Sequence, residues 1–375
     1  MMKNLKVKKL RYSLIGCGRI AINHIQAYLD NNKDLELVAL CDIDTSKAEE
    51  LIEKFNLEKK IAIYRDYKVM IGKENLDLVV IAVNSGKHAE LSIECLRKKI
   101  NVIVEKPMAL SIKDADKMIE IAKKNKVKLC VSHQNRFNKS IQKLRNALET
   151  KKFGKLFYGT AHVRWNRNKD YYDQAKWRGT WEKDGGALMN QCIHNIDLLR
   201  WMMGGEIEEV FAYTDNLNHG YIEGEDLGLA VIKFKNGSYG LVEGTVNTYP
   251  QNLEETLYIF GESGTVKIGG KSVNKIDVWK FNNENEEEVL NEYKENPPNV
   301  YGFGHSALYK DMIESIRNDR EPYVSGIEGK NGLELVLAIY KSVKIKKPVK
   351  LPLKNFSTLN MKDVIKKKHE TKQKK

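Results

Sequence analysis

The feature that most constrains the fold is a turn with two glycines, Gly16 and Gly18, between an apolar run and a stretch with helical spacing. The run at residues 12–15 predicts a buried strand, and residues 20–29 predict a helix directly after the turn. Glycine allows the backbone to turn sharply and to approach a phosphate without a Cβ in the way. The N–H groups and the dipole of the helix start would then face the negative charge. The pattern predicts a site for a dinucleotide pyrophosphate, and the alternative is a plain turn that binds nothing.

An acidic residue, Asp42, follows a second apolar run at residues 35–40. It lies about 20 residues beyond the glycine turn, where a carboxylate can accept hydrogen bonds from both ribose hydroxyls of adenosine and would repel a 2′-phosphate. The spacing favours NAD over NADP, and the alternative is an exposed acid at a strand end. The cofactor-binding residues predicted from this segment are Gly16, Gly18, Arg19, Ile20 and Asp42.

The first third of the chain alternates apolar runs with amphipathic helical patterns. Further runs lie at residues 76–83, 101–104 and 127–132, with helical patterns at 88–98 and 112–125. Short apolar runs without alternation are typical of parallel strands buried on both faces. The repetition predicts a doubly wound parallel sheet of the Rossmann type, in an NAD-binding domain of residues 1–135.

The pattern changes after residue 155. Longer, alternating strands are expected at residues 156–165, 208–214, 227–234, 255–260 and 265–268. The dipeptide Asn236-Gly237 predicts a β-hairpin. Successive antiparallel strands predict an open, mostly antiparallel sheet covered by helices on one face. Helical patterns at residues 187–203, 306–317 and 330–341 could provide this cover, and the last helices, which follow the sheet, could return to pack on either domain.

We therefore expect an α+β substrate domain at residues 136–355 and a basic tail at 356–375. The net charge of +13 is concentrated at the two ends, because residues 1–11 hold five basic groups and no acid, and residues 361–375 hold seven lysines against two acids. Lysine-rich ends are usually solvated, so this distribution argues against a nucleic-acid partner.

Cysteine usage and hydropathy exclude other classes. The five cysteines include no C-x-x-C pair, which argues against a zinc site and against a disulfide framework. No apolar run approaches the roughly 20 residues of a membrane helix. We expect a cytoplasmic protein with no metal and no membrane partner.

A lysine beside a proline, Lys106-Pro107, follows the strand predicted at residues 101–104. In a doubly wound sheet, ligands bind beyond the carboxyl ends of the strands. Proline fixes its own φ and keeps the preceding residue out of a helical conformation. A lysine held there could bond a substrate hydroxyl, stabilise alkoxide charge or take the proton. A surface lysine beside a turn is the alternative.

A second candidate is the helical pattern that contains Asn190, His194 and Asp197. Asn190 and His194 are four residues apart and would share one face of a helix. Histidine titrates near neutral pH, which suits proton transfer during alcohol oxidation. The alternatives are a buried core histidine and a metal site with His194 and Asp197, for which no third ligand is evident.

Arginines and aromatic residues gather between residues 164 and 181. They are Arg164, Trp165, Arg167, Tyr171, Tyr172, Trp177, Arg178 and Trp181. Arginine suits carboxylate and phosphate groups, and planar rings suit sugar or base faces. The clustering favours a ligand over a loop that packs on the sheet edge. The predicted substrate-binding residues are Arg164, Trp177, Arg178, Asn190, Gln191 and His194.

Together these segments resemble the Gfo/Idh/MocA family of oxidoreductases. The resemblance covers roughly residues 9–345 and is carried by Ile15–Ala21, Cys41–Asp44, Val104–Leu110 and Gly185–His194. It implies an N-terminal Rossmann domain, a C-terminal α+β domain with a large open sheet, and oxidation or reduction of a sugar or cyclitol carbon with NAD(P). It also implies a homodimer or homotetramer, which we expect to form through the C-terminal sheet.

The resemblance further implies that Lys106 and His194 are the catalytic pair. Many members carry aspartate at the position of Asn190, and asparagine cannot relay a proton, so we expect Asn190 to orient the substrate or His194. Additional contacts to the cofactor are expected from Asn84, His88, Glu105 and Lys106.

Three segments, at residues 164–180, 187–191 and 264–274, are most similar to the sugar-nucleotide branch of the family. That branch comprises the UDP-N-acetylglucosaminuronate 3-dehydrogenases. The predicted function is NAD-dependent oxidation of a ring hydroxyl, at C3, of UDP-N-acetylglucosaminuronate or UDP-N-acetylglucosamine to the 3-keto sugar. The alternatives are an inositol or simple-sugar dehydrogenase, a glycosidase that oxidises C3 transiently, and a non-catalytic NAD-binding regulator.

Overall fold

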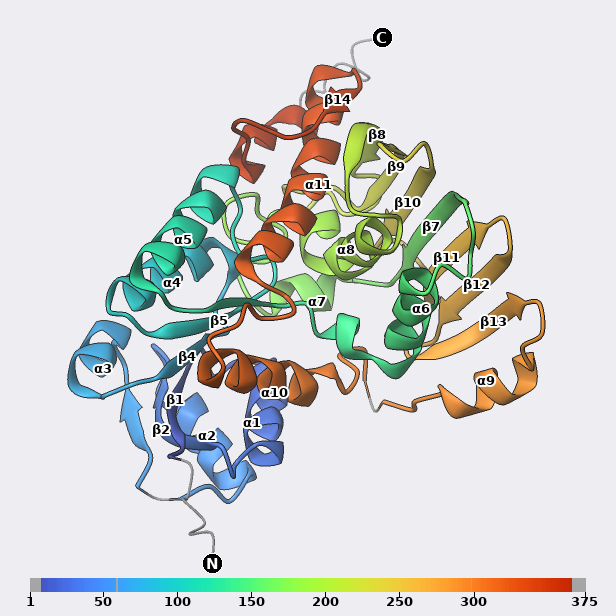
Figure 1. Ribbon diagram of the computed structural model, residues 1–375. Coiled ribbons are helices and arrows are strands. Elements are labelled where there is room, and N and C mark those ends of the chain that lie inside the picture. The colour runs from blue at the N-terminus through green and yellow to red at the C-terminus, as the bar shows by residue number, and fades with distance from the viewer. Residues whose placement is uncertain (1–7, 59, 298, 366–375) are drawn as a thin grey trace, which may run out of the picture. The chain divides into compact units, whose positions relative to one another are not determined.

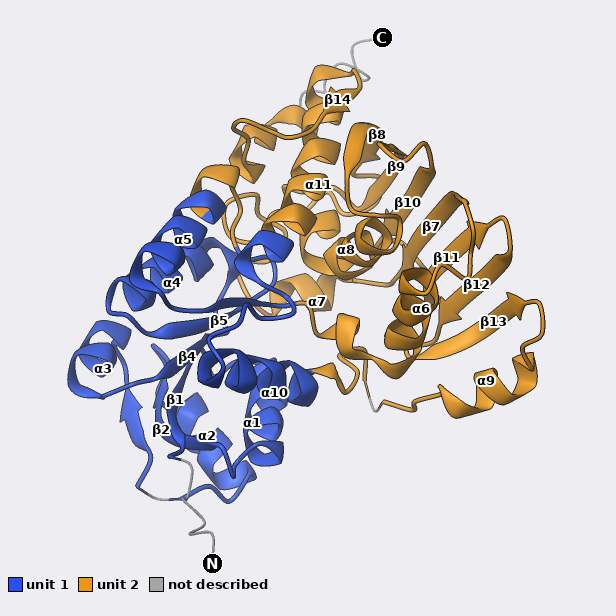
Figure 2. Cartoon of the chain, in the orientation of Figure 1, with its two compact units in different colours: residues 1–108, 115–132, 305–329 blue, residues 109–114, 133–304, 330–375 orange. Residues whose placement is uncertain are grey.

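The computed structural model describes residues 8–58, 60–297 and 299–365 (Figure 1). Much of the charge predicted for the two ends falls in residues 1–7 and 366–375, outside the described residues. The chain forms two compact units (Figure 2). The first runs to Met108 and adds Ala115–Ser132 and His305–Gly329, and the second holds Ala109–Asp114, His133–Gly304 and the chain from Lys330. None of the described helices is long and apolar enough to cross a membrane.

The first unit is built on a parallel sheet. Its strands are β1 Leu10–Ile15, β2 Leu35–Cys41, β3 Ala62–Tyr64, β4 Leu78–Ile81, β5 Asn101–Glu105 and β6 Leu129–Ser132. Within the described residues the sheet has six strands in the order β3-β2-β1-β4-β5-β6, and all neighbouring pairs are parallel. The order reverses between β1 and β4, so the predicted doubly wound sheet is confirmed.

Buried apolar side chains explain why these runs form strands. Every residue of β4 is buried, as expected for a central parallel strand that is covered on both faces. The edge strand β3 was not among the expected strands, because three half-buried residues are too few to show a period.

Helices connect and cover these strands. They are α1 Ala21–Asp30, α2 Ser46–Lys54, α3 Tyr67–Lys73, α4 His88–Arg97, α5 Ile112–Asn125 and α10 Gly304–Arg317. The last of these comes from far along the chain, and its residues from His305 belong to the first unit. Its Tyr309 hydroxyl lies 3.1 Å from that of Tyr12 on β1. The helical pattern at residues 306–317 therefore packs on the first sheet rather than covering the second.

The second unit contains a larger sheet. Its strands are β7 Leu156–Arg164, β8 Ile207–Asp215, β9 Leu227–Phe234, β10 Tyr239–Thr245, β11 Glu254–Gly261, β12 Gly264–Gly269, β13 Lys275–Phe281 and β14 Val349–Lys350. Among the described residues it has eight strands in the order β13-β12-β11-β7-β10-β9-β8-β14. Its pairs are antiparallel except β7 with β10, so the predicted mostly antiparallel sheet is confirmed.

The predicted hairpin joins β9 and β10. Gly237 in its turn has a φ of 84°, a left-handed conformation that glycine adopts without strain. β13 and the two-residue β14 were not among the strands expected from the sequence.

One face of the second sheet carries helices of the same unit (Figure 1). The helices of this unit are α6 Lys139–Glu149, α7 Lys169–Asp173, α8 Ile193–Met202, α9 Glu286–Glu292 and most of α11 Gly326–Ile345. Glycine allows α8 to approach the sheet closely, since a Cβ at Gly159 would lie 2.9 Å from the Leu199 side chain and 2.8 Å from that of Met203.

Candidate active site

The glycine turn lies between β1 and α1, as predicted. Gly16 has a φ of +98°, and a Cβ there would lie 2.4 Å from the backbone oxygen of Ala82. Gly18 differs, because a Cβ at this position would meet no atom of the described chain within 4 Å. The first glycine is therefore required by the fold itself, whereas the second leaves open space above the turn. Open space at a helix N-terminus fits a pyrophosphate.

Asp42 lies beside this turn. Its Oδ2 accepts a hydrogen bond from the Cys17 N–H at 2.8 Å, and its Oδ1 accepts one from the Asp44 N–H at 2.9 Å. The Gly16 N–H donates to the Cys41 carbonyl at 2.8 Å, which holds the ends of β1 and β2 together. The structure thus brings Gly16 and Asp42 together, while Arg19 and Ile20 occupy the end of the turn before α1.

The next strand end carries Asn84 and His88. The side-chain Oδ1 of Asn84 is buried and has no hydrogen-bond partner among the described residues, which fits a ligand contact. Both ring nitrogens of His88 face backbone oxygens, Nδ1 that of Pro107 at 2.7 Å and Nε2 that of Val83 at 3.1 Å. His88 therefore holds the loops after β4 and β5, and its contact with a cofactor stays a prediction.

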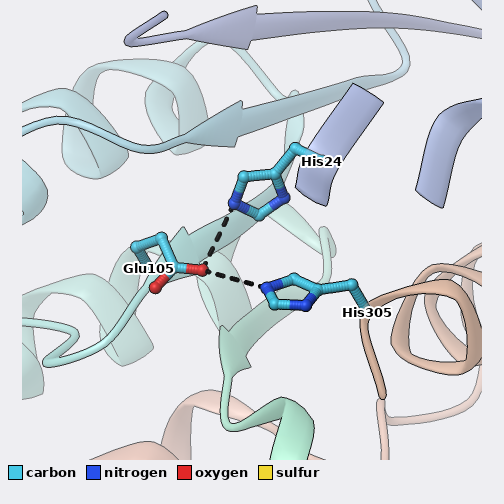
Figure 3. A group of neighbouring side chains, drawn as sticks. All are labelled: His24, Glu105 and His305. Carbon is cyan, nitrogen blue, oxygen red and sulfur yellow. Dashed lines mark ion pairs between the residues drawn. The ribbon is translucent and has the colours of Figure 1, made fainter. Parts of the chain in front are cut away.

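Lys106 and Glu105 end β5. Lys106 is half-buried, but the Glu105 carboxylate points inward, where Oε1 lies 3.2 Å from Nε2 of His24 and 3.8 Å from Nε2 of His305 (Figure 3). Burial alone would raise the pKa of Glu105, but the two histidine rings that face its carboxylate outweigh burial and lower that pKa well below its usual range. Glu105 is thus an ionised buried group. Sequence reasoning missed both histidines, because nothing in their local patterns marks them.

In the second unit, the helix predicted at residues 187–203 begins as a π-helical turn, Leu188–Cys192, and continues as α8. Such wide turns occur often at functional sites. Asn190 lies in the π turn and its side-chain amide donates to the Asp184 carboxylate. His194, in the first turn of α8, is only 8% exposed and packs edge-on against His133, with ring centroids 5.4 Å apart.

Asp197 pairs with a buried arginine. It is fully buried, and Nε and Nη2 of Arg136 donate to its two oxygens, each at 2.7 Å. Although burial alone would raise the pKa of Asp197, the charge of Arg136 lowers it. Because Arg136 uses both oxygens, the geometry argues against the alternative of a metal held by His194 and Asp197.

A buried carboxyl, Glu225, supports the π turn. Its Oε1 accepts hydrogen bonds from the Leu188 N–H and from the Tyr340 hydroxyl, each at 2.7 Å. Burial raises the pKa of Glu225 to about 7. No sequence signal identifies this residue.

Several predicted substrate residues gather around the ring of Tyr171. The Tyr171 hydroxyl accepts hydrogen bonds from Arg178 and, at 2.8 Å, from Gln191. The Arg178 guanidinium lies over the rings of Tyr171 and Trp177, at 4.2 and 4.7 Å from their centroids. We call this group, with Arg167, the Tyr171 cluster.

Arg167 was part of the arginine and aromatic run but not among the predicted substrate residues. Its Nε donates to Gln191 Oε1 at 3.0 Å, and its guanidinium lies 5.0 Å from the Tyr171 ring centroid. Burial lowers the pKa of Arg167. The sequence could have identified Arg167, because it lies in the same arginine and aromatic run as Tyr171, Trp177 and Arg178.

Arg164 lies elsewhere. It is on β7, where its guanidinium bonds both oxygens of Glu243, at 2.7 and 2.5 Å, and also Glu254. These strand carboxylates raise the pKa of Arg164, Glu243 most strongly. The structure does not bring Arg164 into the Tyr171 cluster.

Comparison with known proteins gives matches over most of the chain. Residues 10–133 match the family description "Oxidoreductase family, NAD-binding Rossmann fold", and residues 145–351 match "Oxidoreductase family, C-terminal alpha/beta domain". Myo-inositol 2-dehydrogenase of Thermotoga maritima is 30% identical over 360 residues, which is 91% of this chain and 98% of that protein.

Two similar solved structures are 38% identical to this chain. The WlbA dehydrogenase of Bordetella pertussis, in complex with NADH and UDP-GlcNAcA, matches 92% of this chain and 100% of its own with a TM-score of 0.82. The WlbA dehydrogenase of Chromobacterium violaceum, with the same two ligands, matches 94% of this chain and 99% of its own with a TM-score of 0.84.

Proposed function

We propose that this chain, which belongs to the Gfo/Idh/MocA oxidoreductase family and is therefore an NAD-dependent dehydrogenase, oxidises the C3 hydroxyl of UDP-N-acetylglucosaminuronate to the 3-keto sugar. The observation that carries this substrate is the Tyr171 cluster, together with two relatives at 38% identity whose structures contain NADH and UDP-GlcNAcA.

The chemistry of the Tyr171 cluster suits such a ligand. A UDP-linked sugar acid presents a diphosphate, a carboxylate and a planar base. Arg167 and Arg178 supply charge-assisted hydrogen-bond donors, and the rings of Tyr171 and Trp177 supply flat surfaces. Since Arg164 is engaged by Glu243 and Glu254, we propose Arg167 in its place as a substrate residue.

In the first unit, the fit to the cofactor rests on three groups. Gly18 leaves space for the pyrophosphate, Asp42 offers its carboxylate to the adenosine ribose, and the unpartnered Oδ1 of Asn84 offers an acceptor. When bound, NAD+ supplies the hydride acceptor.

The remaining steps belong to side chains. His194 accepts the proton of the ring hydroxyl, since a neutral imidazole is a base near physiological pH. Lys106 donates a hydrogen bond to the same oxygen and stabilises the negative charge that develops there. Asn190, which cannot carry a proton, orients the substrate.

The Lys106→Ala variant tests these roles. Turnover of UDP-GlcNAcA, followed by NADH absorbance, should fall by about 10²-fold or more, because the developing alkoxide loses its cationic partner. NAD affinity, measured by titration, should stay close to native. Exposed Lys117 on α5 provides the control, since Lys117→Ala should leave both quantities unchanged. Near-normal turnover of Lys106→Ala would contradict the assignment.

A second candidate function rests on the 30% identity to a myo-inositol 2-dehydrogenase. NADH formation with myo-inositol, in the absence of response to UDP-GlcNAcA, would favour it. Lack of NADH formation with either, combined with DNA binding at physiological salt, would favour the non-catalytic regulator.

We also propose that a second copy of this chain covers the open face of the second sheet. Large apolar side chains project there from neighbouring strands β7, β9 and β10, and a shallow hollow lies among them. The exposed residues are Phe157, Tyr158, Val231, Tyr239 and Leu241. Exposed apolar patches of this kind mark protein interfaces. Sedimentation as a monomer at micromolar concentration would contradict this assembly.

A further inference from the structure

Three buried histidines surround the short segment that carries Lys106. They come from different helices of the first unit: His24 from α1, His88 from α4 and His305 from α10. Their exposed fractions are 0%, 1% and 4%. None of them was identified in the sequence as a partner of Lys106. Burying three imidazoles is costly unless their polar atoms are used, so their placement calls for an explanation.

On one side of Lys106, two of these histidines face the Glu105 carboxylate (Figure 3). Glu105 Oε1 lies 3.2 Å from His24 Nε2 and 3.8 Å from His305 Nε2. The other oxygen, Oε2, accepts from the Lys106 N–H at 3.3 Å. The carboxylate therefore connects the two histidines with the backbone of Lys106.

Two tyrosines set the orientation of His24. Its Nδ1 lies 3.0 Å from the Tyr309 hydroxyl, which in turn lies 3.1 Å from the Tyr12 hydroxyl. When Tyr12 donates to Tyr309 and Tyr309 donates to Nδ1, the N–H of a neutral His24 is on Nε2, toward Glu105. The chain of contacts thus supports the carboxylate without requiring a charged imidazole.

On the other side of Lys106, His88 holds Pro107. Its Nδ1 lies 2.7 Å from the Pro107 backbone oxygen, and its Nε2 lies 3.1 Å from that of Val83. Val83 follows β4 and Pro107 follows β5, so one ring joins the two loops. A neutral imidazole has a single N–H, and the shorter contact is the one to Pro107.

We propose that His24, His88 and His305 are positioning residues that hold Glu105 and Pro107, and thereby fix Lys106 between them. This inference rests on the role of Lys106 in the proposed function. Its physical basis is that a long, flexible lysine side chain reaches a defined point only when its backbone is fixed. Contacts to both flanking residues provide that constraint from three separate helices.

Glu105 and its two histidines are also spaced so that one ion could contact all three, since their nearest ligand atoms lie within 4.8 Å of one another. The carboxylate already accepts a hydrogen bond at Oε2 from the Lys106 N–H, and the His24 ring lies 3.2 Å from its Oε1. We therefore favour positioning, and a divalent cation becomes one outcome of the test.

The test measures Lys106 directly rather than turnover. The NAD-bound protein is treated with a trace of acetic anhydride, and peptide mass spectrometry gives the labelling of half-buried Lys106 relative to exposed Lys117 in the same unit. The variants are His24→Ala, His88→Ala and His305→Ala. The matched control is His162→Ala, a half-buried histidine on β7 whose ring contacts Thr256.

The labelling ratio should change by about threefold or more in His24→Ala, His88→Ala and His305→Ala, since lysine reactivity depends on nearby charge and on backbone position. It should stay within about 1.5-fold of the native ratio in His162→Ala. The variants His24→Gln and His305→Gln keep an N–H donor and should restore part of the native ratio. In a Glu105→Gln background, His305→Ala should add nothing, because its target has lost its charge. Where a single alanine variant does not fold, the same substitution is measured in the Glu105→Gln background.

Unchanged ratios in folded variants, or additive effects of Glu105→Gln and His305→Ala, would overturn the proposal. So would a stoichiometric metal, found by elemental analysis of the purified protein and lost in His305→Ala. Failure of UDP-GlcNAcA to react would refute only the proposed function, because acetylation of Lys106 needs no substrate.

Discussion

The glycine turn of the first unit and the Tyr171 cluster of the second unit differ in what holds their functional groups in place. At the glycine turn, backbone groups do so: the Gly16 N–H bonds the Cys41 carbonyl, and the Cys17 N–H bonds Asp42. In the Tyr171 cluster, side chains do so: Arg178 and Gln191 both donate hydrogen bonds to the Tyr171 hydroxyl. A backbone-built site depends on strand order, whereas a site built from side chains depends on the burial of particular partners. The two should therefore fail in different ways.

The largest effect is expected from Gly16→Ala. Gly16 has a left-handed φ, and a Cβ added there would lie 2.4 Å from the Ala82 carbonyl oxygen, so there is no room for a methyl group. We expect a loss of about 5 kcal/mol of stability, or no folded protein. Gly18→Ala, where the chain leaves space, should fold normally but bind NAD weakly. Thermal unfolding and NAD titration measure both. Equal stability of the two variants would remove the distinction between a glycine required by the fold and one reserved for the ligand.

The corresponding change in the second unit is Asp197→Asn. It leaves the Arg136 guanidinium buried without its anionic partner, and we expect the unfolding free energy to fall by about 4 kcal/mol. The control is Glu149→Gln at the exposed Arg145 pair on α6, which should cost about 0.5 kcal/mol or less. Denaturant titration compares them, and similar losses would show that burial is not what matters here.

A smaller, pH-dependent effect is expected from Glu225→Gln. The pKa of Glu225 is about 7 in the folded protein and close to 4.5 when unfolded, so the protonated carboxyl stabilises the fold fully below about pH 4.5. This stabilisation is lost as pH rises to about 7, and the loss amounts to about 3 kcal/mol relative to the glutamine variant. Melting temperatures of both proteins over this range provide the measurement. If the melting temperatures of the two proteins changed in parallel with pH, the predicted loss of stability would be contradicted.

The smallest effect sharpens the comparison within the second unit. Arg167→Lys should raise the KM for UDP-GlcNAcA by about tenfold, because lysine cannot reproduce the planar contacts with Gln191 and Tyr171. Arg164→Lys should change KM by about twofold or less, since Glu243 and Glu254 already engage that side chain. A larger rise in KM for Arg164→Lys than for Arg167→Lys would support Arg164 as the substrate residue.

The fold was largely predictable because its signals are local. Apolar runs gave the parallel strands, and Asn236-Gly237 gave the β9–β10 hairpin. Short or edge elements escaped, as β3 and β14 did, because two or three residues carry no measurable period. The helix at residues 306–317 was found, but its amphipathic pattern does not say which sheet its apolar face covers.

The sequence by itself determined the glycine turn, the acid that follows it, the Rossmann order and the segment that contains Lys106, since each depends on neighbours in the chain. Only the tertiary structure decided which partners the polar side chains have. Arg164 bonds strand carboxylates, Asp197 pairs with Arg136, and His24 and His305 face Glu105. The physical reason is that a polar side chain is stabilised by whatever partner is buried beside it, and such partners come from distant parts of the chain.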